Sequence, residues 1–249
     1  MHVEVLGSGE MLRGEFRPGS SSAGMAVVYV HDLGSRRDGE KSAALAAACA
    51  RREWTFAAFD FRGHGSSDGA PRELTATHLI EDLSAIHAFL VARDHPRLGL
   101  VGSSMGAFAA AWFAIRHPEA VAGCVFLAPA FRFVGRRWEE LTEPERLEWA
   151  RTGVRRVRNE WIDMEIGYGL VQERAAFEPT DLARRWRTPL LIYHGMADDV
   201  VPAAESIAFV ESMTYPNVEL RLLKAGDHRL TAFKDEIAEA ACRFLDAQR

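Results

Sequence analysis

The sequence of 249 residues predicts an α/β protein, in which a mostly parallel β-sheet is flanked by helices. Short apolar runs rich in Val, Ile, Leu and Phe alternate along the chain with longer segments of helical period, as in such sheets. The length is close to the upper end for one α/β domain, so we expect a single domain over residues 1–249. With 48% apolar and 26% charged residues, the composition excludes disordered, collagen-like and disulfide-scaffold proteins.

The elements are expected in the following order. An antiparallel hairpin, 3–6 and 12–16, turns around the glycines at 7 and 9, and a plain loop at 19–24 follows it. Six buried strands then complete an eight-stranded sheet, at 26–31, 55–60, 98–103, 121–128, 190–194 and 218–223. Between these strands the helical period predicts helices at 39–52, 76–91, 105–117, 203–213 and 231–247.

The segment 131–187 interrupts this alternation. It contains no convincing strand pattern, its longest helical pattern covers 143–159, and it holds four of the six tryptophans, Trp138, Trp149, Trp161 and Trp186. A helical, aromatic insertion between two strands predicts a small helical cap over one edge of the sheet, within the same domain.

Charge and cysteine content exclude several partners. The net charge is −5 and the isoelectric point about 6.0, whereas a nucleic-acid-binding domain usually has an isoelectric point above about 9, so we expect no nucleic-acid partner. The three cysteines, Cys49, Cys124 and Cys242, are far apart and form no C-x-x-C pair. This favours neither a disulfide framework nor a zinc knuckle, and indicates a reducing compartment.

The first residues, MHVEVLGSGEMLRGEF, lack the continuous apolar core of a signal peptide, so we expect a cytoplasmic location. Residues 98–115 carry no charge, which meets a crude membrane-span threshold of about 18 residues. The centre of this stretch reads GSSMG, however, which favours a buried strand, a tight turn and a buried helix. We therefore expect no integral membrane segment.

That turn, residues 102–106, matches the pattern G-x-S-x-G between a strand and a helix. In this context Ser104 is expected on a strained turn that projects its hydroxyl above the sheet, because Gly102 and Gly106 let strand and helix approach closely. A serine hydroxyl is a weak nucleophile, so it needs a base, and the base needs an orienting acid.

Two later loops supply the expected partners of Ser104 in the order acid, then histidine. HGMADDVVP (194–202) follows an apolar strand and contains Asp198 and Asp199, of which Asp198 is the expected acid. KAGDHR (224–229) follows the next strand and presents His228 as the base. The other eight histidines are interpreted as structural, surface or pocket-lining residues, and their spacing predicts no metal site. No cofactor is expected.

The oxyanion of an acyl-transfer intermediate would be bound by backbone N–H groups. One is expected from Met105, which follows the nucleophile, and one from Leu33 in the loop HDLGS (31–35).

Taken together, HDLGS, DFRGHGSSDG, GSSMG, HGMADDVVP and GDHR occur in the order shown by the α/β-hydrolase superfamily, which most of the chain resembles. Within this superfamily, three stretches resemble the α/β-hydrolase domain-containing protein 10 type and the bacterial relatives of that type: DGEK (38–41), HGMADDVVP and DHR (227–229). Proteins of this type are acyl-protein thioesterases and acyl-glucuronide esterases. The resemblance implies the α/β-hydrolase fold and assigns the catalytic acid to Asp198. The loop HDLGS departs from the common His-Gly-Phe or Gly-Gly pattern of the family.

The leading hypothesis is a carboxylesterase or thioesterase that cleaves a small-molecule acyl ester or thioester through an acyl-Ser104 intermediate. One alternative is an enzyme that uses the same three residues to hydrolyse a carbon–carbon bond or a peptide bond. Hydrolysis of a carbon–carbon bond would need a carboxylate-binding arginine in the cap, such as Arg151, Arg155, Arg156 or Arg158. Another alternative is a non-catalytic binding protein on the same fold. A dehalogenase or epoxide hydrolase is disfavoured, because those enzymes use aspartate at the position of Ser104.

Overall fold

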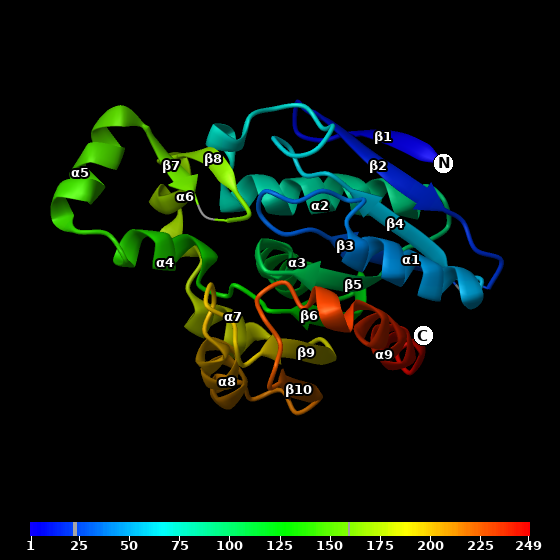
Figure 1. Ribbon diagram of the computed structural model, residues 1–249. Helices are drawn as coiled ribbons and strands as arrows, with labels where there is room; N and C mark the ends of the chain where they lie inside the picture. The colour runs from blue at the N-terminus through cyan, green and yellow to red at the C-terminus, as the bar shows by residue number, and fades with distance from the viewer. Residues whose placement is uncertain (22–23, 159) are drawn as a thin grey trace.

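The computed structural model describes residues 1–21, 24–158 and 160–249, and its centre is one eight-stranded sheet (Figure 1). The strands lie in the order β1-β2-β4-β3-β5-β6-β9-β10. β2 pairs antiparallel with both β1 and β4, whereas the six strands from β4 to β10 pair parallel to one another. The predicted sheet of eight strands, mostly parallel, is confirmed.

The observed elements agree closely with the predicted ones. The strands of the sheet are β1 (His2–Leu6), β2 (Met11–Arg17), β3 (Met25–Val30), β4 (Thr55–Phe59), β5 (Arg97–Ser103), β6 (Val121–Leu127), β9 (Leu190–Gly195) and β10 (Val218–Leu223). The flanking helices are α1 (Glu40–Arg51), α2 (Ala76–Val91), α3 (Met105–Arg116), α8 (Ala203–Ser212) and α9 (Lys234–Asp246). A short 3-10 turn, Thr231–Phe233, precedes α9. Of the predicted loop at 19–24, residues 22 and 23 lie outside the described residues.

Both faces of the central strands β3, β4, β5, β6 and β9 are buried, which explains their continuous apolar runs. The expectation that 218–223 is a buried strand is wrong, because β10 lies at the edge of the sheet and its residues are half-buried or exposed. Alternate residues of β3 enter two different cores: Val28 and Val30 pack with residues of α2 and α3, whereas Val27 and Tyr29 pack with residues of α1 and α9. α1 and α9 lie together on one side of the sheet (Figure 1). This layering places the carboxyl ends of the parallel strands, and the loops after them, at one edge of the sheet.

The segment 131–187 corrects one prediction. It contains the helices α4 (Phe133–Glu139), α5 (Glu143–Thr152), α6 (Gly169–Gln172) and α7 (Pro179–Arg185) and a 3-10 turn (Arg174–Ala176), but also a two-stranded hairpin, β7 (Val154–Arg158) and β8 (Asp163–Gly167). The expectation that no strand lies here is therefore wrong, as is the helix at 143–159. The helix ends at Gly153, which adopts a left-handed backbone (φ 75°), and Asn159 lies outside the described residues.

Figure 1 shows α4, α5, α6 and the β7–β8 hairpin grouped at one end of the molecule, away from both termini. Two of the segment's tryptophans are fully buried anchors: the Trp149 Nε1–H donates to the carbonyl of Ile166, and the Trp186 Nε1–H donates to that of Thr188. The role of the segment as a cap, and the single domain over 1–249, stay predictions.

Candidate active site

Ser104 lies on the sharp turn that joins β5 to α3. Its backbone has φ 50° and ψ −112°, a conformation that residues other than glycine rarely adopt. Its N–H donates to the Leu127 carbonyl at 2.9 Å. The two glycines of the motif are required sterically. A Cβ at Gly106 would lie 2.1 Å from the Val30 carbonyl oxygen, and one at Gly102 would lie 2.7 Å from Cα of Ala107.

The three residues expected to act together lie in one hydrogen-bonded chain. His228 Nε2 lies 3.1 Å from Ser104 Oγ, and His228 Nδ1 lies 2.8 Å from Asp198 Oδ2. They come from loops after β5, β9 and β10, so residues up to 124 positions apart meet at the carboxyl ends of the strands. This arrangement fits a nucleophile, a base and an orienting acid.

Asp198, and not the exposed Asp199, faces His228. Its Oδ1 accepts the N–H groups of Val200 and Val201 at 2.9 and 2.8 Å, which fixes the carboxylate. Burial raises the pKa of Asp198, but hydrogen bonds from His194 and His228 outweigh it and hold that pKa well below the ordinary value. Asp198 is therefore ionised at neutral pH, as an orienting acid must be.

His194 is the second histidine at this carboxylate. Its Nε2 lies 3.1 Å from Asp198 Oδ2 and 2.9 Å from the Val201 carbonyl, and its Nδ1 lies 2.7 Å from Ser206 Oγ. The side chain is fully buried. His194 thus has the structural hydrogen bonds that its position at the end of a strand predicts.

Leu33 and Met105 lie where oxyanion-binding N–H groups are expected. Met105 begins α3 directly after Ser104, and Leu33 lines the same cavities as Ser104. Within the described part of the chain, neither backbone N–H donates a hydrogen bond to another protein group. Both can therefore donate to an oxygen bound next to Ser104, and their role stays a prediction.

A largely buried ion pair that the sequence analysis did not identify lies behind the loop of Leu33. Lys41 Nζ lies 3.1 Å from Asp32 Oδ2 and donates to Ser103 Oγ at 2.7 Å. Burial raises the pKa of Asp32, but the charge of Lys41, together with hydrogen bonds from the backbone N–H of Asp32 and from Lys41, outweighs it and holds the pKa below its ordinary value. Lys41 therefore ties the loop of Leu33 to Ser103, the residue before Ser104.

Replacing Lys41 with Met is expected to lower the free energy of unfolding by about 3–5 kcal/mol at pH 7, because the Asp32 carboxylate would remain buried without its partner. Since the folded-state pKa of Asp32 lies below its unfolded value, the pair stabilises the fold above about pH 4, and this contribution is lost as the pH falls through the folded-state pKa. Urea unfolding of both proteins at pH 7 and in mild acid measures the difference.

The control is the double variant Asp32→Asn, Lys41→Met, which removes both charges and should regain part of the lost stability. A loss in Lys41→Met that is the same at both pH values, and that the second substitution does not reduce, would contradict this role of the pair.

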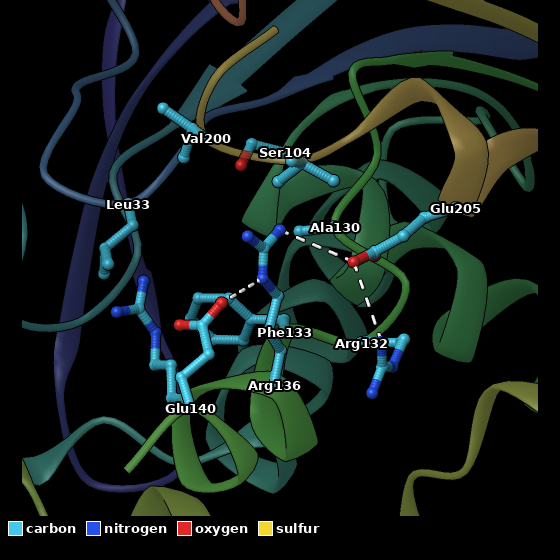
Figure 2. A pocket seen from close by; sticks show the side chains of 11 residues that line it. Leu33, Ser104, Ala130, Arg132, Phe133, Arg136, Glu140, Val200 and Glu205 are labelled. Atoms are coloured by element: carbon cyan, nitrogen blue, oxygen red, sulfur yellow. Dashed lines mark hydrogen bonds and ion pairs between the residues drawn. The ribbon is translucent and has the colours of Figure 1, made fainter.

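Two cavities open onto Ser104. The first, named here the Phe133 cavity, has a volume of about 130 Å³ and combines apolar side chains, Leu33, Ala130, Phe133, Val200 and Val201, with the charged residues Arg132, Arg136, Arg137, Glu140 and Glu205. Figure 2 shows Ser104 and Val200 at one end of the Phe133 cavity, and the ion pair between Arg136 and Glu205 farther from Val200. The second, named here the Trp161 cavity, has about 230 Å³ and is lined by Leu33, Ser104, Arg137, Trp161, His228 and Arg229, among others.

The arginines that the sequence offered as carboxylate ligands do not lie at these cavities. Arg151 pairs with Glu148 and Arg155 with Glu145, while Asp163 lies 2.5 Å from Arg156 and 3.7 Å from Arg158. Arg137, which sequence reasoning missed, lines both cavities instead.

Among the residues that the structure describes, no group of three or more His, Cys, Asp or Glu side chains could hold a metal ion. In the same residues, no helix is both long and apolar enough to cross a membrane.

The chain is similar to a known family and to several known proteins. Residues 22–159 match the family described as serine aminopeptidase, S33. The chain is 26% identical to palmitoyl-protein thioesterase ABHD10, mitochondrial, from Rattus norvegicus. The aligned 212 residues are 84% of this chain and 70% of the rat protein. The Mus musculus protein is 28% identical over 210 residues, 82% of this chain and 69% of that protein.

Solved structures show the same fold. A hydrolase from Agrobacterium vitis S4 superimposes with a TM-score of 0.86 at 26% identity, over 98% of both chains. The mouse α/β hydrolase domain-containing protein 10 has a TM-score of 0.84 at 24% identity, over 99% of this chain and 98% of that one. Est1E from Butyrivibrio proteoclasticus, solved with ferulic acid bound, has a TM-score of 0.84 at 19% identity, over 99% of this chain and 98% of that one.

Proposed function

Because the chain belongs to the α/β-hydrolases of the family described as serine aminopeptidase, S33, we propose that it hydrolyses small-molecule carboxylic esters or thioesters through an acyl-Ser104 intermediate. The observation that carries this proposal is the hydrogen-bonded chain from Ser104 through His228 to Asp198. Relatives support the thioester chemistry, since the ABHD10 proteins are named palmitoyl-protein thioesterases.

The reaction follows from the geometry. Ser104 Oγ attacks the acyl carbonyl carbon while His228 Nε2 takes its proton, and the carbonyl oxygen becomes an oxyanion that the Leu33 and Met105 N–H groups stabilise. When the tetrahedral intermediate collapses, the bond to the alcohol or thiol breaks and His228 returns the proton to that leaving group. Water, deprotonated by His228, then attacks the acyl carbon of the acyl-enzyme. When this second tetrahedral intermediate collapses, the bond to Ser104 Oγ breaks, His228 returns the proton to Ser104 Oγ, and the acid is released.

A peptidase is the second candidate, because the matched family is described as a serine aminopeptidase. Carbon–carbon hydrolysis would need a carboxylate-binding arginine. Arg151, Arg155 and Arg156 pair with acids, whereas Arg137 lines the cavities at Ser104. The names of the relatives support thioester hydrolysis instead. A non-catalytic binding protein would not need Ser104, His228 and Asp198 to be joined by hydrogen bonds.

The test compares p-nitrophenyl esters from acetyl to palmitoyl, the matching acyl-CoA thioesters and aminoacyl p-nitroanilides. We expect turnover of at least one ester or thioester series, with kcat/KM at least a hundredfold above that of any anilide. Turnover of anilides alone would favour the peptidase, and turnover of no substrate by folded protein would contradict the proposal.

The proposed partner is thus a small-molecule ester or thioester. The cytoplasmic location stays a proposal from the sequence, and the curated relatives carry the word mitochondrial in their names.

A further inference from the structure

Arg137 is a cation without an obvious partner beside the nucleophile. It lies on α4 and lines both cavities that open onto Ser104. Its Nε is buried without a hydrogen-bond partner, and no carboxylate forms an ion pair with it, within residues 1–21, 24–158 and 160–249. Burial lowers the pKa of Arg137 to about 10, so the side chain remains charged at neutral pH. An uncompensated cation in such surroundings is costly unless something binds it.

The neighbouring arginines of the Phe133 cavity are compensated. Arg136 donates to Glu140 at 2.5 Å and lies 3.4 Å from Glu205, and Arg132 lies 3.9 Å from Glu205 (Figure 2). Arg132 also pairs with Glu139. Glu140 also acts on Arg137 through its charge, but its carboxylate is bonded to Arg136. The Arg137 guanidinium also lies near an aromatic ring, with its Cζ 5.1 Å from the centre of Phe133.

A second cation faces the same space. Arg229 follows His228 and lines the Trp161 cavity together with Arg137, and its guanidinium Cζ lies 4.5 Å from the centre of the Trp161 ring. Asp32, the acid of this cavity, is paired with Lys41. Among its described lining residues, the Trp161 cavity therefore presents two guanidinium groups, and the charge of its acid, Asp32, is already balanced by Lys41. Such a cavity attracts anions.

We propose that Arg137, assisted by Arg229, binds a carboxylate of the substrate, so that the esters this protein prefers carry an anionic group beside the scissile bond. A planar guanidinium can bind both oxygens of a carboxylate, which gives orientation as well as attraction. The inference rests on the proposed ester hydrolysis at Ser104. The carboxylate could belong to the acyl part or to the alcohol part of the ester.

The test uses two matched ester pairs that place the charge on either side. p-Nitrophenyl hydrogen adipate and its methyl ester differ in a carboxylate on the acyl part, whereas 4-carboxyphenyl butyrate and its methyl ester differ in one on the alcohol part. The quantity measured is the ratio of kcat/KM, charged ester over methyl ester. We expect Arg137→Met to lower this ratio about 30-fold for one pair, and that pair identifies the side that carries the charge.

Arg137→Lys, which keeps the charge but not the planar fork, should lower the ratio less than Arg137→Met does. The control is Arg151→Met, which removes an exposed arginine of α5 that pairs with Glu148 and should leave both ratios within twofold of the wild-type values. Ratios that Arg137→Met leaves within twofold for both pairs would overturn the inference.

Failure of the inference and failure of the proposed function give different results. If the methyl esters are hydrolysed by the wild-type protein but not by Ser104→Ala, while Arg137→Met leaves both ratios unchanged, the function stands and the carboxylate site is wrong. If Ser104→Ala hydrolyses all four esters as fast as the wild type, the function itself is wrong, and the inference falls with it.

Discussion

Replacing Ser104 with Ala should lower kcat for the best ester or thioester substrate by about 10⁶, the loss seen when other enzymes of this mechanism lose their nucleophile. The reason is that no other hydroxyl replaces Ser104 Oγ, which lies 3.1 Å from His228 Nε2. The remaining activity would come from water and the oxyanion-binding N–H groups. Initial rates at saturating substrate measure the loss.

The matched control is the adjacent serine. Ser103 lies at the end of β5 and its hydroxyl accepts a hydrogen bond from Lys41, so Ser103→Ala should keep kcat within tenfold of the wild-type value. Circular dichroism shows whether both variants fold. If folded Ser104→Ala retained more than one per cent of wild-type kcat, the assignment of the nucleophile would be wrong.

Replacing Asp198 with Asn should lower kcat by about 10⁴. An amide can present an N–H to His228 Nδ1, which favours the tautomer whose Nε2 carries the proton and cannot accept one from Ser104. The substitution keeps the shape of the side chain and one oxygen for the N–H groups of Val200 and Val201, so the fold is expected to survive. kcat and a thermal melt measure the two effects separately.

Asp199→Asn is the control for this change, because Asp199 is exposed and does not face His228. We expect less than a threefold change in kcat. Equal losses in the two variants would mean that Asp198 does not orient the histidine.

Much of this site could be predicted from the sequence because its signals are local. A G-x-S-x-G turn between an apolar strand and a helix places Ser104, and loops after the next strands along the chain place Asp198 and His228 at the same sheet edge. The central strands are predictable because both of their faces are buried, which gives continuous apolar runs.

What the sequence did not reveal depends on tertiary partners. β7 was missed because three of its five residues are arginines, whose charges are compensated by acids such as Glu145 and Asp163 from other elements. The contact of Lys41 with Asp32 and Ser103 joins three separate elements. Arg137 differs from Arg136 only in what surrounds it, and no sequence pattern separates the two.

The central claim is that Ser104 is a nucleophile activated by His228. The most direct measurement is reaction of the folded protein with a fluorophosphonate, followed by intact mass and peptide mass spectrometry. We predict one adduct per chain, located on Ser104, and its absence in Ser104→Ala and after heat denaturation. A folded wild-type protein that forms no adduct, or that forms one at another residue, would contradict the account.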